Sequence, residues 1–165
     1  TLDLMTAVYG DKYSRKELKI MTDDKEIIFR EIYKNNVVPI AGFMEMFELI
    51  KSKKILVGIA SNAIRKNVKM ILSELKIYNK FDSIICGDEV KKGKPDPEMF
   101  NETVDKFKLK KEECLIFEDS IEGVTAAVNS NVDVIGITSS SSDKILRDRG
   151  CKLTIENYLN FDLSI

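Results

Sequence analysis

The segment Cys114-Leu-Ile-Phe-Glu-Asp-Ser-Ile-Glu-Gly123 gives the clearest indication of how this chain is organised. Its first four residues are apolar and predict a short buried strand. The strand ends at two adjacent acids, Glu118 and Asp119, and a helix is expected to follow. Ligands of open α/β sheets bind at the carboxyl ends of the strands, and paired carboxylates there suit a hard cation such as Mg²⁺. The alternative is that Asp119 only caps the next helix, with Glu118 solvated beside it.

Length and charge limit the classes of protein that fit. The chain has 165 residues, enough for one compact domain and a small appendage. Its 26 basic and 27 acidic residues nearly cancel and form no block, so we expect neither nucleic acid nor a membrane as a partner. No apolar run approaches the roughly 20 residues that span a bilayer, and no signal-peptide pattern is present, which predicts a cytoplasmic protein.

The absence of histidine narrows the chemistry further. It excludes Ser-His and Cys-His nucleophile pairs and zinc sites built from histidine. The three cysteines are odd in number and far apart, so they predict neither a disulfide framework nor a close-spaced metal pair. Any chemistry must therefore use carboxylates, lysine, hydroxyl groups and a cofactor or ion.

Hydrophobic periodicity divides the chain into two parts. Residues 1–37 have helical spacing and no strand pattern, with Ser14 as a helix N-cap and Asp23-Asp24 opening a further helix. An extended linker follows, because Pro39 disfavours helix at the residue before it. We therefore predict a partial helical cap over residues 1–37 and an α/β core over residues 38–165.

In the second part, helical and strand patterns alternate. The expected strands are residues 55–60, 83–86, 114–117, 134–137 and 153–155. The expected helices are residues 43–50, 64–75, 97–107, 121–128 and 143–147. Such alternation predicts a doubly wound parallel sheet with right-handed crossovers, a Rossmann-like α/β fold. The carboxyl ends of its strands would then lie along one edge.

The first strand of this core leads directly into Ser61-Asn62 and a helix. Ser61 can donate its hydroxyl to a phosphate group, and the free N–H groups at the start of the helix attract phosphate oxygens. The alternative is an ordinary N-cap. The sequence therefore predicts an anion site at this junction, provided that other charged groups reach it.

A second candidate lies in Gly93-Lys94-Pro95-Asp96-Pro97. The two prolines restrict the backbone, so Lys94 is expected to be held in place. A lysine fixed beside carboxylates can hold a phosphate and reduce its repulsion by the acids. Lys91 and Lys92 lack this restraint and are predicted to be surface residues.

These groups follow successive strands, so a parallel sheet would bring them to one edge. Their order and neighbours resemble the haloacid dehalogenase-like (HAD) superfamily of Mg²⁺-dependent phosphohydrolases. The similarity is to the branch that holds phosphoglycolate phosphatase, sugar-phosphate phosphatases and β-phosphoglucomutase. It covers about residues 14–160. The motifs that carry it are Ile-Ala-Ser-Asn at 59–62, Gly-Lys-Pro-Asp-Pro at 93–97 and Phe-Glu-Asp-Ser-Ile-Glu-Gly-Val at 117–124.

The resemblance implies a role for each candidate. Ser61 would bind the transferring phosphoryl group with help from Asn62, and Lys94 would steady that group and the nucleophile. Asp119 would bind Mg²⁺, with Glu118 acting directly or through water. The implied function is hydrolysis of a small phosphorylated metabolite, a sugar phosphate or a compound of the phosphoglycolate type. Phosphoryl transfer of the β-phosphoglucomutase type and non-catalytic binding of phosphate or protein are the alternatives.

One element of the family pattern is missing. Members of the family attack phosphorus with the first aspartate of an Asp-x-Asp motif at the end of an N-terminal strand, and this chain contains no Asp-x-Asp. The resemblance thus implies that the first strand and the opening helix of the cap are absent and that this chain alone is inactive. Exposed strand edges would then favour self-association. A truncated sequence, a second chain that supplies the strand, and a degenerate member that only binds remain open.

Overall fold

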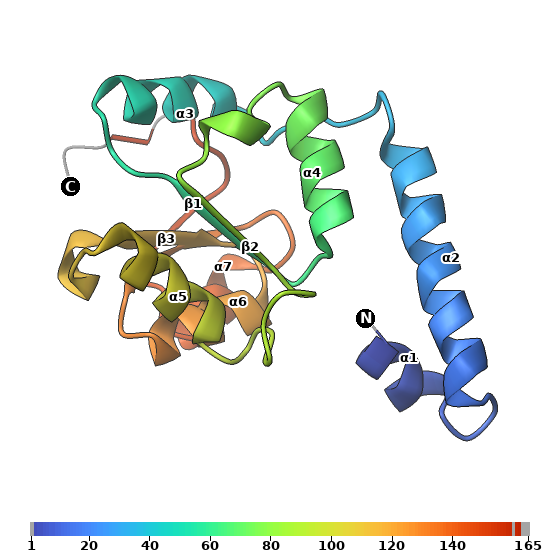
Figure 1. Ribbon diagram of the computed structural model, residues 1–165. Helices are drawn as coiled ribbons and strands as arrows, with labels where there is room; N and C mark the ends of the chain where they lie inside the picture. Colours follow the sequence, from blue (N-terminus) through green and yellow to red (C-terminus); the bar gives the residue numbers. More distant parts are fainter. Residues whose placement is uncertain (1, 160, 163–165) are drawn as a thin grey trace.

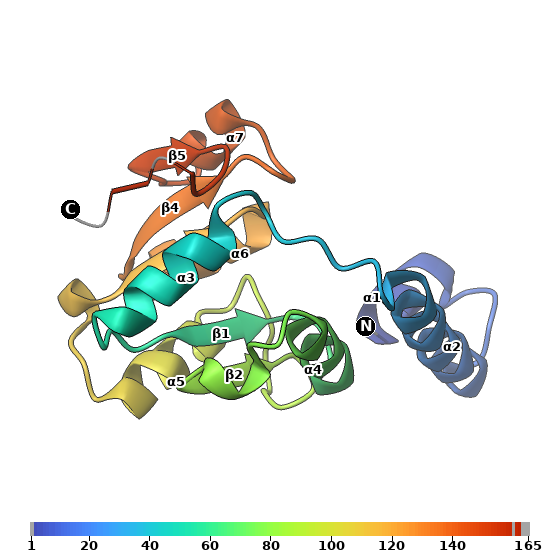
Figure 2. The same ribbon diagram turned by 90° about the horizontal axis from the view of Figure 1, so that it is seen from above.

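The computed structural model of the chain describes residues 2–159, 161 and 162, apart from the side chains of residues 3 and 4. Two helices, α1 (Leu2–Tyr9) and α2 (Arg15–Tyr33), stand beside an α/β part. An extended segment joins α2 to that part, as Figures 1 and 2 show from two directions. The predicted extended linker around Pro39 is therefore confirmed.

Helix α2 begins at the predicted cap. The Ser14 N–H donates to Glu17 at 2.8 Å and the Ser14 side chain accepts from the Glu17 N–H, which together form a capping box. The prediction that Asp23-Asp24 opens a further helix is wrong, because α2 continues without a break for 19 residues. Lys19 Nζ lies 3.5 Å from Asp23 Oδ2, one helical turn away. Asp23 therefore lies on the surface of a continuous helix and not at the start of a new one.

The α/β part alternates helices and parallel strands, which confirms the predicted fold class. Its strands are β1 (Gly58–Ser61), β2 (Ser83–Cys86), β3 (Leu115–Glu118), β4 (Asp133–Ile137) and β5 (Leu153–Ile155). Its α-helices are α3 (Phe43–Ser52), α4 (Arg65–Glu74), α5 (Glu98–Phe107), α6 (Ile121–Asn129) and α7 (Asp143–Asp148). Short 3₁₀ turns, η1 (Tyr78–Lys80) and η2 (Lys111–Glu113), precede β2 and β3.

Strand β1 begins three residues later than predicted. The N–H of Val57 donates to Asp82 Oδ2 at 2.8 Å, and the N–H of Asp82 donates to the Val57 carbonyl at 2.8 Å. Asp82 is itself paired with Lys51 at 2.7 Å. A side chain therefore takes the backbone hydrogen bond that a longer strand would have used.

The strands form two sheets, although the sequence predicts one. β1 pairs with β2, and a second sheet has the order β3-β4-β5, with every pair parallel. Among the strands that the structure describes, none pairs with the second edge of β1 or of β3. The predicted doubly wound sheet is therefore divided between these two strands.

Burial is low in β1 and β3, where a continuous parallel sheet would be most buried. β4 is buried at its last four positions and β2 at three of its four. In contrast, β1 has no buried residue and β3 has only Glu118, while Leu115 of β3 is 43% exposed. The two strands that border the division are therefore less buried than their paired neighbours, β2 and β4.

Two apolar clusters hold the layers together. One consists of Phe47, Val68, Leu72, Ile77 and Cys86, beside β1 and β2. The other consists of Phe100, Val124, Ala126, Ala127, Val134, Leu146 and Cys151. Ala60 of β1 and Ile116 of β3 both pack against the second cluster. Within the described residues, the two sheets are thus joined by side-chain packing and not by backbone hydrogen bonds.

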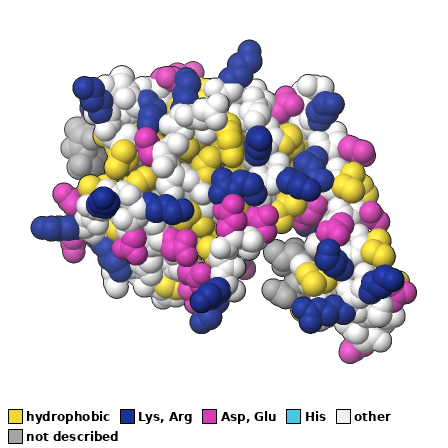
Figure 3. Space-filling model, in the orientation of Figure 1, with side chains coloured by type: hydrophobic (Ala, Val, Ile, Leu, Met, Phe, Trp, Pro, Cys, Tyr) yellow, Lys and Arg dark blue, Asp and Glu magenta, His cyan; other side chains and the backbone are white. Residues whose placement is uncertain are grey.

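The surface carries charges of both signs. Figure 3 shows Lys and Arg side chains interspersed with Asp and Glu over the visible face, with no large area of one sign. This mixture agrees with the near balance of basic and acidic residues in the sequence. None of the described helices has both the length and the apolar character that crossing a bilayer would require.

Candidate functional site

The carboxyl ends of β1 and β3 border one open pocket of about 480 Å³. Its walls include all five residues singled out in the sequence, namely Ser61, Asn62, Lys94, Glu118 and Asp119. Ser61 is the last residue of β1 and Glu118 the last of β3. Parallel strands therefore bring together side chains from three separate segments of the chain.

Lys94 and Glu118 form a buried ion pair between Nζ and Oε1. Each side chain is only 9% exposed. Lys94 Nζ also lies 4.8 Å from the centre of the Phe100 ring, a cation–π contact. The second oxygen of Glu118 accepts hydrogen bonds from Ser120 Oγ at 3.2 Å and from the Asp119 N–H at 3.3 Å. Both oxygens of this buried carboxylate are therefore satisfied, as a buried charge requires.

Asn62 holds the loop that carries Lys94. Asn62 Oδ1 accepts from the Lys94 N–H at 2.8 Å, and Nδ2 donates to the Lys94 carbonyl at 3.2 Å. A Cβ atom at Gly93 would lie 2.7 Å from Asn62 Oδ1, so glycine leaves room for this contact. The sequence attributed the restraint on Lys94 to two prolines, and the structure adds the amide of Asn62.

Asp119 is oriented by the loop after β4. Its Oδ2 accepts hydrogen bonds from Ser139 Oγ at 3.0 Å and Ser140 Oγ at 2.5 Å. The alternative that Asp119 caps the next helix is wrong, because Ser120 is the N-cap of α6 and accepts from the Gly123 N–H at 3.0 Å. Asp119 Oδ1 accepts no hydrogen bond from the described residues, which leaves it available to a ligand.

These carboxylates fit part of a magnesium site. Asp119 Oδ1 is a hard oxygen donor of the kind that Mg²⁺ prefers, whereas Glu118 is engaged by Lys94. Within the described part of the chain, no three His, Cys, Asp or Glu side chains are grouped in a way that could hold a metal ion. Further oxygen ligands would therefore be needed to complete a site.

The helix that follows Ser61 is less open to anions than the sequence suggests. The Arg65 N–H in its first turn donates to Asp88 Oδ1 at 2.9 Å. A carboxylate from the loop after β2 thus occupies this positive helix end. Ser61 Oγ accepts from the Ala63 N–H at 3.2 Å, which leaves the hydroxyl proton of Ser61 free to be donated.

Arg65 also stabilises the loop after β2. Its guanidinium donates to both oxygens of Glu89, at 2.6 and 2.5 Å, and to the Ile84 carbonyl at 2.7 Å. The hydrogen bond from Arg65 lowers the pKa of Glu89, and the same contact raises the pKa of Arg65. This charged pair therefore fixes the start of α4 relative to β2.

Tyr158 is a pocket residue that sequence reasoning missed. Its ring packs on Phe117 and Phe43, with centroids 5.6 and 5.8 Å apart. Burial raises the pKa of Tyr158 to about 12, and the charges of Asp119 and Glu118 add to this effect. The phenol is therefore neutral at neutral pH. A single tyrosine in a polar stretch has no periodic signal that could have indicated this position.

Gly123 provides space for Glu118. A Cβ atom at Gly123 would lie 1.9 Å from Glu118 Oε2. We expect Gly123→Ala to lower the free energy of unfolding by roughly 1–3 kcal/mol, because Glu118 must move away from its buried partners. Urea denaturation measures this loss.

Two variants check the cause of that loss. Glu122→Ala, on the exposed side of the same helix, should change stability by no more than about 0.5 kcal/mol. In the double variant G123A/E118A, the clash is removed, so the combined loss should be smaller than the sum of the two single losses. Additive losses would contradict the contact.

Comparison with known proteins supports the resemblance seen in the motifs. The sequence profile of the family described as haloacid dehalogenase-like hydrolase matches residues 3–137. The "Phosphorylated carbohydrates phosphatase" of Thermotoga maritima is 32% identical over 146 residues, which cover 86% of this chain and 66% of that protein. The β-phosphoglucomutase of Bacillus subtilis is 25% identical over 114 residues, which cover 69% of this chain and 49% of that protein. The chain thus spans less than two thirds of either relative.

A solved structure agrees with the fold. The crystal structure of a HAD hydrolase of family IA, variant 3, from Entamoeba histolytica superposes with a TM-score of 0.85 at 25% identity. The alignment covers 98% of this chain and 74% of the other. Profile, relatives and fold all lead to one assignment: the chain belongs to the haloacid dehalogenase-like hydrolases.

Proposed function

We propose that the complete protein hydrolyses a small phosphomonoester and that the pocket between β1 and β3 holds the phosphoryl group. The observation that carries this proposal is that Ser61, Lys94 and Asp119, from three segments of the chain, line one pocket. The Thermotoga maritima relative is named for phosphorylated carbohydrates, which supports a sugar phosphate as the class of substrate.

The residues present would provide binding and electrostatic stabilisation. The Ser61 hydroxyl would donate to a phosphoryl oxygen, and Lys94 would be shared between that oxygen and Glu118. Asn62 would act through the loop, because both polar ends of its amide are bonded to the Lys94 backbone. Such fixed groups lower the barrier to phosphoryl transfer by stabilising charge on the equatorial oxygens.

Mg²⁺ would supply further neutralisation of the phosphoryl charge when it is bound. Asp119 would hold it through Oδ1, since Ser139 and Ser140 already bind the other oxygen. Glu118 would contribute directly or through water while it keeps Lys94 in place.

We propose that the nucleophile is an aspartate on a strand that lies between β1 and β3. Three observations support this: the chain has no Asp-x-Asp, the facing edges of β1 and β3 are unpaired among the described strands, and these strands are less buried than their outer neighbours. That carboxylate, the first aspartate of an Asp-x-Asp motif, would attack phosphorus. The second aspartate of the motif would donate a proton to the leaving alcohol. Water would then hydrolyse the aspartyl-phosphate and release phosphate.

We also propose that α1 and α2 form part of a helical cap over residues 1–37, and that residues 38–165 form the core.

Phosphoryl transfer of the β-phosphoglucomutase type is the second candidate function, supported by the similarity to the Bacillus subtilis enzyme. Product analysis would separate the two, because a phosphatase releases inorganic phosphate and a mutase yields an isomeric sugar phosphate.

Phosphate binding tests the pocket without requiring turnover. We expect Ser61→Ala to weaken the binding of inorganic phosphate about tenfold in the presence of Mg²⁺, because one hydrogen bond to a charged oxygen is lost. A ³¹P NMR titration measures the affinity. Ser73→Ala, at an exposed position on α4, serves as the control and should bind phosphate like the unmodified chain. Equal affinity in both variants would contradict the proposed role of Ser61.

A further inference from the structure

Asn67 is a buried amide on α4 whose partners lie on α2. It is 3% exposed. Its Oδ1 accepts from Arg30 Nη1 at 2.7 Å, and its Nδ2 donates to Glu26 Oε2 at 2.5 Å. Both ends of the amide are therefore satisfied across the contact between the two helices. Asn67 also lies in the first turn of the helix that starts beside the pocket.

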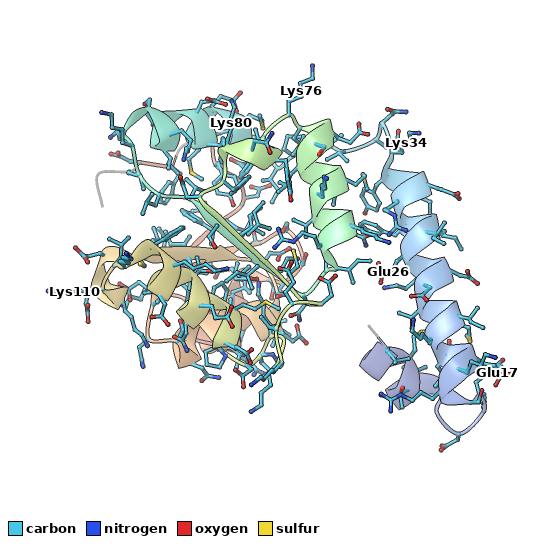
Figure 4. The ribbon with its side chains drawn as sticks, viewed as in Figure 1. Glu17, Glu26, Lys34, Lys76, Lys80 and Lys110 are labelled. Atoms are coloured by element: carbon cyan, nitrogen blue, oxygen red, sulfur yellow. The ribbon has the colours of Figure 1, made fainter. Side chains whose placement is uncertain are left out.

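The two partners are spaced to act together. Glu26 and Arg30 are four residues apart, so they lie on one face of α2. Figure 4 labels Glu26 on the flank of α2 that faces α4. Burial raises the pKa of Glu26, but hydrogen bonds from Lys25 and Asn67 more than offset this, and the net pKa is lowered. Glu26 is therefore an anion that accepts from the buried amide.

The rest of the contact between α2 and the α/β part is thin. Leu18 is the buried residue of α2, whereas Ile28 and Ile32 are 54% and 63% exposed. For the part of the chain that the structure describes, the hydrogen bonds from α2 to the α/β part are those made to Asn67. The hydrogen bonding between α2 and the α/β part thus runs through one polar bridge, and the extended segment after Tyr33 makes the covalent connection.

We propose that Glu26, Asn67 and Arg30 form a polar latch that fixes α1 and α2 relative to the pocket. A buried amide that loses its partners is costly, so the latch is stable either with both bonds made or opened to water. Because Asn67 belongs to the first turn of α4, the latch links the position of the helical pair to the segment that follows Ser61. These contacts lie outside the pocket and do not depend on the proposed phosphate chemistry.

Asn67→Asp tests the direction of the hydrogen bonds. The introduced carboxylate keeps an acceptor for Arg30, but it loses the donor and faces Glu26 with like charge. We expect hydrogen exchange of α2 amides and tryptic cleavage after Lys34 to become about tenfold faster, while exchange in β4 stays unchanged. Adding Glu26→Gln restores a donor, and the double variant N67D/E26Q should return to within about twofold of the original rates.

The matched control is Asn79→Asp, an exposed asparagine in η1. It should leave both rates unchanged. The proposal is overturned if N67D leaves α2 exchange and Lys34 cleavage unaltered, if exchange rises equally in β4, or if N67D/E26Q does not restore the original rates. No phosphate or metal ion enters these measurements, so their outcome is separate from the phosphate titration of Ser61→Ala.

Discussion

Lys94→Met is expected to lower the free energy of unfolding by about 3–5 kcal/mol. The change leaves the Glu118 carboxylate buried without its cation, and it also removes the charge from the face of the Phe100 ring. Breaking a buried ion pair costs far more than the pair contributes, because one charge stays desolvated and unpaired. Urea denaturation followed by circular dichroism would measure the loss.

An exposed pair in the same chain gives the control. Lys152 and Asp133 are 77% and 63% exposed, so Lys152→Met should cost less than about 1 kcal/mol. The double variant K94M/E118Q removes the orphaned charge and should recover a large part of the loss. If Lys94→Met costs no more than Lys152→Met, then the pair does not stabilise the pocket.

A version of the protein that carries a strand ending in Asp-x-Asp is expected to hydrolyse p-nitrophenyl phosphate on the order of 10³-fold or more faster than the same version with the first aspartate changed to asparagine. The strand would pair with the free edges of β1 and β3 and cover exposed residues such as Leu115. Its aspartate would then reach the phosphoryl group held by Ser61 and Lys94.

This experiment also separates the remaining explanations. The chain of 165 residues, assayed alone with Mg²⁺, should show no turnover above background. A domain that only binds would gain stability from the added strand but no activity. Robust hydrolysis by this chain alone, or equal rates for the aspartate and asparagine versions, would show that the nucleophile assignment is wrong.

Elements set by local patterns were predicted well. The run Ser83–Cys86 forms β2 with the predicted bounds. A short run with β-branched residues between polar turns favours a strand in an α/β fold. The helix N-cap at Ser14 is a second confirmed prediction, and the structure adds its capping-box partner Glu17, three residues away. The five candidate residues lie in one pocket because each stands at or beyond the carboxyl end of a parallel strand.

Features that depend on distant residues were not predicted. The delayed start of β1 results from a bond with Asp82, which lies 25 residues beyond Val57. Ser139 and Ser140 lie in a run of four serines without a helix or strand pattern, and only folding brings their hydroxyl groups to Asp119. Hydrophobic periodicity likewise does not predict the division of the sheet, because it indicates where strands occur but not which strands pair with one another.

The cap of α4 has a consequence for the order of assembly. The residue at its own N-cap position, Ile64, makes no capping bond with its side chain, and the first-turn N–H of Arg65 is satisfied by Asp88 from the loop after β2. That hydrogen bond cannot form until β2 has docked beside β1. The first turn of this helix is therefore completed by a partner 23 residues further along the chain, and that hydrogen bond forms only after the loop between them has closed.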